Sequence, residues 1–166
     1  MSKITFFLLL NVALFIPMLV GAQTSEPNSA IFMEILGNGL VYSFNYDTRF
    51  SPKQDGLGGR AGISYLAIDG ASLATVPLVM NYLLGKNGKY FEMGLGATYV
   101  AAADRTNTNS RSNPINRADG WLGTMSFGYR SQPVDGGFLF RAGVTPLFGS
   151  GSFWPFYPQV SFGYAF

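Results

Sequence analysis

The 166-residue sequence contains no histidine and no cysteine. Without histidine, the Ser-His-Asp and Cys-His arrangements that hydrolases and acyltransferases use cannot be assembled. Metal sites that depend on His or Cys ligands are excluded for the same reason. Disulfides cannot hold the fold, and no cysteine is present to carry a lipoprotein anchor. We therefore expect no catalytic site, no metal and no cofactor, and we predict that the protein is not an enzyme.

Charged residues are also scarce, at 12% of the chain, whereas soluble domains have about 25%. Hydrophobic residues make up 48% and aromatic residues 16%. A globule of this composition would dissolve poorly, so part of its surface is expected to face something other than water. The same composition excludes a disordered chain. The net charge of +2 is too small to indicate a nucleic-acid partner.

Residues 1–22 have the pattern of a secretory signal peptide. An apolar run from Ile4 to Val20 follows a basic start, and small residues precede the expected cleavage after Ala22. A membrane anchor is the rival interpretation, but the run is short for a spanning helix and is interrupted by Asn11 and Pro17. The rest of the chain has no apolar run of helix-spanning length. The mature protein is therefore predicted to begin at residue 23.

Beyond the signal peptide, the apolar residues recur with a period of two, which is typical of strands and not of helices. For example, Phe91, Met93 and Leu95 share one face, and Glu92 and Gly94 lie on the other. Stretches rich in Gly, Asn, Asp and Pro separate these runs. The pattern predicts strands near residues 30–36, 39–50, 57–68, 73–84, 90–102, 120–131, 137–148 and 154–166.

Most of these predicted strands hold 10–13 residues, longer than the globular average of about 5–6 and close to the roughly 9–11 that cross a membrane. A soluble sandwich or lipocalin-like barrel would also alternate. However, its apolar face would point inward, and an eight-stranded barrel has no room for so many large side chains. The predicted fold is all-β: an eight-stranded antiparallel up-and-down transmembrane β-barrel over residues 23–166, with large residues toward lipid.

The predicted turns alternate between the two ends of the barrel. The one long connection, Ala102–Asp119, falls on the outer side, where barrels of this kind carry their longer loops. The stretch Gly37-Asn38-Gly39 is either an outer turn or a bulge within one strand. An even strand number favours the turn.

The charged residues within the strands all fall on the face that carries small and polar residues. An arginine on the lipid face would cost about 2–4 kcal/mol at the bilayer centre, so these side chains are expected in the lumen. One interpretation is a network of ion pairs that closes the barrel, and the other is the lining of a narrow gated passage. The residues are Glu34, Asp47, Arg49, Arg60, Glu92, Arg130 and Arg141.

Two surface features remain. Aromatic residues at strand ends are expected to form girdles at the membrane interfaces; they are Phe50, Tyr82, Tyr90, Tyr129, Trp154 and Phe166. The long outer loop carries arginines that are candidates for contact with lipopolysaccharide phosphates or an external partner, because arginine suits phosphate recognition. They are Arg105, Arg111 and Arg117.

The signal peptide, the eight alternating strands and the terminal VSFGYAF resemble the small outer-membrane barrels typified by the membrane domain of outer membrane protein A. More narrowly, segments such as EILGNGLVYSFNY and GYRSQPVDGGFLFRAGVTPLF are similar to uncharacterised barrels from Bacteroidetes-type bacteria. The resemblance implies the bacterial outer membrane as location, with its lipid and lipopolysaccharide as surroundings. It also implies that the last strand is the signal read by the barrel assembly machinery, here Val160, Phe162, Tyr164 and Phe166.

Two functions are compatible with these observations. The first is a non-enzymatic barrel with a closed lumen and a structural or surface-interaction role. The second is a narrow channel or transporter for small or hydrophobic solutes. A general diffusion pore is not expected, because eight strands leave no aqueous channel without rearrangement.

Overall fold

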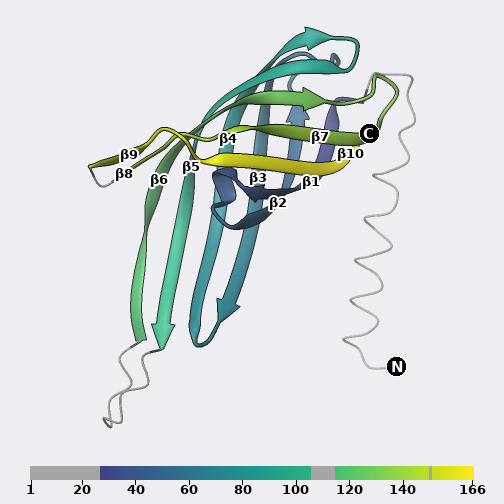
Figure 1. The fold of residues 1–166 in the computed structure, drawn as a ribbon. Helices are drawn as coiled ribbons and strands as arrows, with labels where there is room; N and C mark the ends of the chain where they lie inside the picture. The colour runs from purple at the N-terminus through teal and green to yellow at the C-terminus, as the bar shows by residue number, and fades with distance from the viewer. Residues whose placement is uncertain (1–26, 106–114, 150) are drawn as a thin grey trace, which may run out of the picture.

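The computed structural model describes residues 27–105, 115–149 and 151–166 (Figure 1). The predicted signal peptide, residues 1–22, lies outside this range. The described part of the chain has no helix that is long and apolar enough to cross a membrane.

The described chain folds into antiparallel strands that pair mainly with their neighbours in sequence (Figure 1). β10 pairs with β1, and β5 pairs with β6, so that the sheet closes on itself. The elements are β1 (Ser29–Leu36), the 3₁₀ turn η2 (Gly37–Gly39), β2 (Tyr42–Arg49), β3 (Gly56–Ile68), β4 (Ala71–Lys86), β5 (Lys89–Arg105), β6 (Ile115–Ser131), β7 (Gly137–Val144), β8 (Leu147–Gly149), β9 (Ser152–Trp154) and β10 (Pro158–Ala165).

β7 and β8 are one barrel strand with a short interruption. Val144 pairs with Phe127 of β6, and Leu147, three residues later, pairs with Thr124, three residues earlier. The register is therefore unbroken. The interruption contains Pro146, whose carbonyl still accepts a bond from the Met125 N–H at 2.9 Å.

β9 and β10 likewise form one strand, which contains a bulge. Val144 pairs with Pro158 and Leu147 pairs with Trp154. The chain therefore advances three residues on the β7–β8 strand and four residues on the β9–β10 strand between the same two pairs. A bulge of this kind bends a strand, and the β8–β9 tip leans away from the barrel (Figure 1). With these two joins, the barrel has eight strands, which confirms the predicted fold class.

Side chains separate by chemistry across the barrel wall, as the alternation predicts. Large apolar residues on the outside are widely exposed, among them Phe44, Ile63 and Phe138. Most inward-facing residues are small or polar and are buried, with a few large apolar ones such as Leu83 and Leu139 among them. Tyr90 is an exception to the predicted girdle: it is buried, and its hydroxyl donates a hydrogen bond of 2.7 Å to Gln54 Oε1. That prediction was wrong, because Tyr90 shares the inward face of β5 with Glu92.

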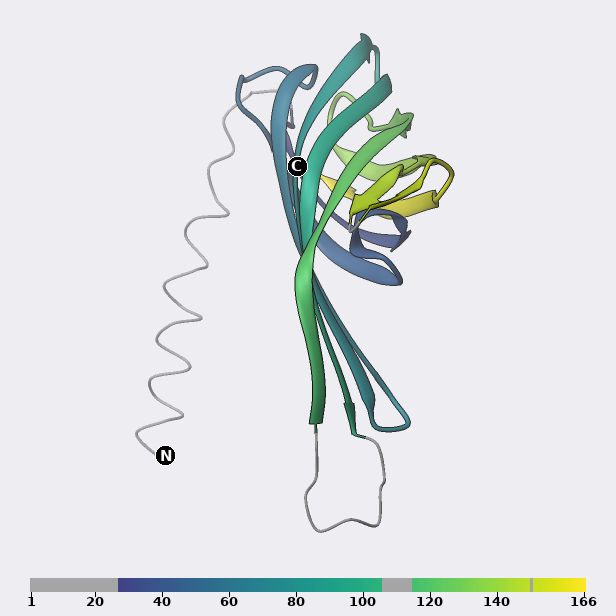
Figure 2. The same ribbon diagram turned by 90° about the vertical axis from the view of Figure 1, so that its left-hand side faces the viewer.

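The strands differ in length, which gives the molecule two distinct ends. At the terminal end, Ser29 and Phe166 exchange backbone hydrogen bonds of 3.2 and 2.9 Å. At the opposite end, here called the far end, β3 to β6 continue as a four-stranded sheet well beyond the short strands (Figure 2). The predicted loop Ala102–Asp119 was too long, because β5 runs to Arg105 and β6 begins at Ile115.

An outer aromatic belt lies where this four-stranded sheet leaves the closed barrel. Tyr99 and Trp121 are paired across β5 and β6, with ring centroids 5.3 Å apart. Tyr65 on β3 is 62% exposed, and its backbone carbonyl accepts a hydrogen bond from the Tyr42 hydroxyl. Aromatic residues at this height are typical of a membrane interface.

Candidate functional site: the charged lumen

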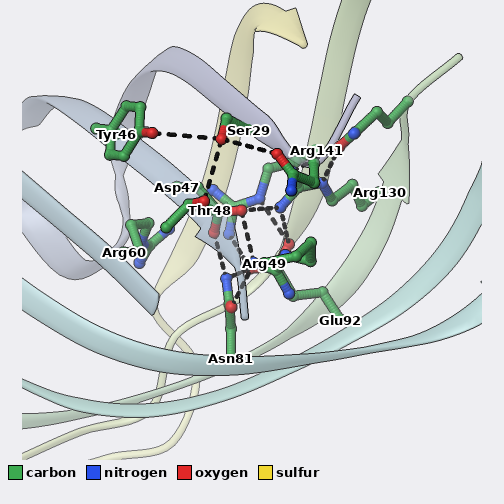
Figure 3. A network of polar contacts seen from close by, with 12 residues as sticks. Ser29, Tyr46, Asp47, Thr48, Arg49, Arg60, Asn81, Glu92, Arg130 and Arg141 are labelled. Atoms are coloured by element: carbon green, nitrogen blue, oxygen red, sulfur yellow. Dashed lines mark hydrogen bonds and ion pairs between the residues drawn. The ribbon is translucent and has the colours of Figure 1, made fainter. Parts of the chain in front are cut away.

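The seven charged residues predicted for the lumen are all brought together there, from six barrel strands. None exposes more than 5% of its surface. Burial of an unpaired charge would cost several kcal/mol, so the arrangement depends on how these groups satisfy one another. Figure 3 shows the part of the network around Asp47 and Glu92.

The tightest contact joins Arg141 of β7 to Glu92 of β5 across the lumen. Arg141 Nε lies 2.8 Å from Glu92 Oε2, and Nη2 lies 2.6 Å from Oε1. This two-pronged geometry is the strongest that an arginine makes with a carboxylate. Arg141 also donates to Glu34 Oε2 and to Ser161 Oγ, both at 3.2 Å. One guanidinium therefore connects four strands.

Glu34 on β1 is the second centre of the network. Its Oε2 accepts a bond of 2.8 Å from Arg60 Nη1, in addition to the Arg141 contact. The Phe32 ring lies beside both cations, with the guanidinium carbons of Arg60 and Arg141 5.7 and 4.5 Å from its centroid. A buried phenyl ring in this position adds cation–π attraction to the ion pairs of both arginines.

Asp47 on β2 is the third centre, nearer the terminal end. Its Oδ1 accepts bonds from Arg49 at 2.6 Å and from Arg130 at 3.1 Å. Asn81 on β4 donates to Asp47 Oδ2 and, at 3.3 Å, to Glu92 Oε1. This amide joins the Asp47 group to the Glu92 group, and Arg141 joins Glu92 to Glu34, so that the seven residues form one connected network.

The turn Gly37-Asn38-Gly39, which connects β1 to β2, folds into the lumen. It is a turn and not a bulge, which resolves the alternative left open by the sequence. Leu36 and Leu40 on either side have φ of 60° and 69°, which residues with side chains rarely adopt. A Cβ on Gly37 would lie 2.8 Å from the Glu34 carboxyl group, so only glycine fits.

Asn38, at the tip of this turn, is fully buried and bonds to four strands. Its N–H donates to Glu34 Oε1 at 3.0 Å, and its Nδ2 donates to Thr124 Oγ1 at 2.8 Å. Its Oδ1 accepts from Arg60, and its carbonyl accepts from Thr98 at 2.7 Å. Asn38 thus closes the lumen above the charges. We call residues 37–39 the plug turn.

The terminal end of the lumen is covered by glutamine side chains. Gln54, from the β2–β3 connection, donates to the carbonyls of Pro133 and Val134, both at 3.0 Å. Gln132 accepts two bonds from Arg130 and donates to the Pro27 carbonyl at 3.0 Å. The charged layer is therefore enclosed from both ends by hydrogen-bonded groups.

The lumen is nearly saturated in hydrogen bonds. Among the described residues, four buried side-chain atoms have no partner: Asn45 Oδ1, Arg49 Nε, Arg60 Nε and Ser126 Oγ. The three lumen carboxylates are each held by arginines through charge-assisted hydrogen bonds. The sequence did not indicate Asn38, Gln54, Asn81 or Gln132, because uncharged polar residues on a polar face carry no distinguishing signal.

The other predicted site residues are placed as follows. Val160, Phe162 and Tyr164 of β10, and Phe166 just after it, alternate with the buried residues Ser161 and Ala165 and therefore face outward. The backbones of Arg105 and Arg117 lie at the far ends of β5 and β6. Arg111 lies outside the described residues.

A closed antiparallel barrel of eight strands, apolar outside and polar within, is the architecture of the small outer-membrane β-barrels, and the present chain has this fold. No model of a known protein family and no curated protein matches the sequence. The chain does match the N-terminal β-barrel domain of Pseudomonas aeruginosa OprF, with a TM-score of 0.62 and 13% identity over 86% of this chain and 100% of that domain. At this identity the likeness concerns the fold. The likeness to Bacteroidetes-type barrels stays a prediction.

Proposed function

We propose that the protein is a non-enzymatic barrel of the bacterial outer membrane, with a closed lumen and a structural or surface-interaction role. The observation that supports this best is the connected network of seven charges, enclosed by the plug turn at one end and by Gln54 at the other. The terminal end then faces the periplasm and the far end faces outward, in keeping with short inner turns and longer outer hairpins.

The location and the fold are tested together by membrane fractionation and gel electrophoresis. The protein should be recovered with outer-membrane lipid, and unheated samples should migrate differently from boiled ones, because a closed barrel resists detergent. A soluble control protein that is not a β-barrel should migrate identically in the unheated and boiled samples. Recovery in the soluble fraction, or co-migration of heated and unheated samples, would remove the basis of the proposal.

A narrow channel is the alternative, and one observation favours it: the lumen is polar throughout its charged layer. Arginines outnumber carboxylates there by one, with four of the former and three of the latter among the described lumen residues. Any current through this path should therefore favour anions.

We also propose that the last strand directs assembly. Phe166 exchanges two backbone hydrogen bonds with Ser29, which fasten the seam between β1 and β10. Deletion of Phe166 should lower the amount of inserted, heat-modifiable protein severalfold. The matched control is Phe156→Ala, which removes an exposed aromatic away from the seam and should insert normally. Equal insertion of both variants would contradict this role.

Arg105, Arg111 and Arg117 remain our candidates for contact with lipopolysaccharide. The proposal rests on their position in the sequence and on the register that places Arg105 and Arg117 at the far end. Lipid phosphates at that level would suit the geometry of arginine.

A further inference from the structure

The inward face of β3 to β6 changes character beyond the plug turn. Beside the plug turn this face is polar: Ser64 Oγ and Thr75 Oγ1 lie 2.7 Å apart, and Thr75 donates to the Gly39 carbonyl at 3.1 Å. Two residues further along each strand, the same face carries Leu66 and Leu73, which are paired with each other. Neither lipid contact nor an opposing wall of strands accounts for apolar side chains there.

These residues form a continuous row across the four strands. Leu66 pairs with Leu73, Leu73 with Ala102, and Ala102 with Ala118. Together with Ile68, they line a groove of about 530 Å³. That volume lies within the range of about 300–1,000 Å³ that small-molecule sites occupy. Asp104, two residues after Ala102 on the same face of β5, also lines the groove.

The groove is open at its sides and closed at its base. β2 pairs with β3 only as far as Ile63, and β8 pairs with β6 only as far as Gly123. No described strand pairs with these edges of β3 and β6 beyond these points, so the groove is open laterally at the far end. At its base, Thr75 and Thr98 bond to the plug turn, which blocks the way into the charged lumen. A ligand can enter the groove without passing through the barrel.

The position of the groove indicates the kind of ligand. Leu73 lies three residues beyond Val76, the partner of Tyr99 in the outer aromatic belt, which corresponds to about 10 Å along the strand. The groove therefore lies on the water side of the belt, where acyl chains of bilayer lipids do not reach. Its volume is too small for a second barrel. An apolar solute with one donor group suits it, the donor directed at Asp104.

We propose that this groove binds a small apolar molecule carrying a hydroxyl or ammonium group, taken from the external medium. The inference rests on the proposed orientation of the barrel. Burial of the apolar part against Leu66 and Leu73 provides the affinity, and the closed base makes the groove a binding site and not a passage.

The test uses the full mature chain in phospholipid vesicles and a benzyl alcohol that bears a photoreactive diazirine. Labelling of the peptides that carry Leu66 and Leu73 should be saturable and should be displaced by unlabelled benzyl alcohol. Leu73→Asn should reduce it roughly tenfold, as expected for loss of one leucine contact. The neighbouring variant Ala74→Asn, on the outward face, should leave it unchanged. Labelling of lipid-facing residues by dissolved probe should not saturate.

Three results would overturn the proposal: labelling confined to outward-facing residues, equal loss in Leu73→Asn and Ala74→Asn, or a Leu73→Cys variant that cross-links two copies and excludes the probe. Each variant is first checked for heat-modifiable migration, and Leu66→Asn replaces Leu73→Asn if the latter does not fold. If the wild-type protein shows heat-modifiable migration but takes no saturable label, the groove proposal fails while the proposed outer-membrane barrel stands.

Discussion

Replacement of Arg141 by methionine should lower the free energy of unfolding by roughly 3–5 kcal/mol, the usual effect of removing one partner from a buried ion pair. Arg141 makes the two-pronged contact with Glu92 and a further contact with Glu34. In its absence, Glu92 keeps only the longer Arg130 contact, at 3.7 Å, and the Asn81 amide. A carboxylate is then left largely uncompensated in a closed interior.

The measurement is denaturant unfolding of the barrel in lipid vesicles, followed by tryptophan fluorescence and gel migration. Lys86→Met is the matched control, since it removes an exposed cation at a turn and should change stability by no more than about 0.5 kcal/mol. If Arg141→Met and Lys86→Met unfold at the same denaturant concentration, the network does not stabilise the barrel in the way that its geometry implies.

The second large effect is expected at Asn38. Asn38→Leu keeps the approximate size of the side chain but removes the bonds to Arg60 and Thr124. Each buried group left without a partner costs about 1–3 kcal/mol, and more when it is charged. The backbone bonds to Glu34 and Thr98 remain available, so the loss reports on the side chain alone.

A double-mutant cycle makes this prediction specific. If Asn38 acts through Arg60, Asn38→Leu should cost less in an Arg60→Met background, with a coupling of about 0.5–3 kcal/mol. Additive losses in the two backgrounds would mean that the plug turn stabilises the barrel by packing and not through its contact with the charged layer.

Much of the fold follows from the alternation of residues. The inward position of the charged residues was predicted because a charge on the lipid face is costly. The predicted alternation is also seen in the structure, where Glu92 is buried in the lumen and its neighbour Phe91 is exposed on the outer face. The strand ends were less well predicted. β5 and β6 continue past the outer aromatic belt, where alanine-rich sequence no longer shows strong alternation.

The internal architecture of the lumen was not accessible from the sequence. A turn such as Gly37-Asn38-Gly39 projects outward or folds inward depending on the space that distant side chains leave, here Thr75, Thr98 and Thr124. Phe32 also faces inward, and the only sequence signal for this is that it shares the strand face of Glu34, two residues later. Leu66 and Leu73 are also large residues on the inward face, and they differ from buried Leu83 and Leu139 in lying beyond the plug turn.

The central claim is that the lumen is closed by the charged network and the plug turn. Single-channel recording of the purified protein in planar bilayers tests it most directly, with Arg60→Ala and Arg141→Ala recorded alongside the wild type. The account predicts no reproducible conductance from the wild-type barrel. Reproducible wild-type current steps whose size changes in either variant would contradict the account, because ions would then be passing through the network itself.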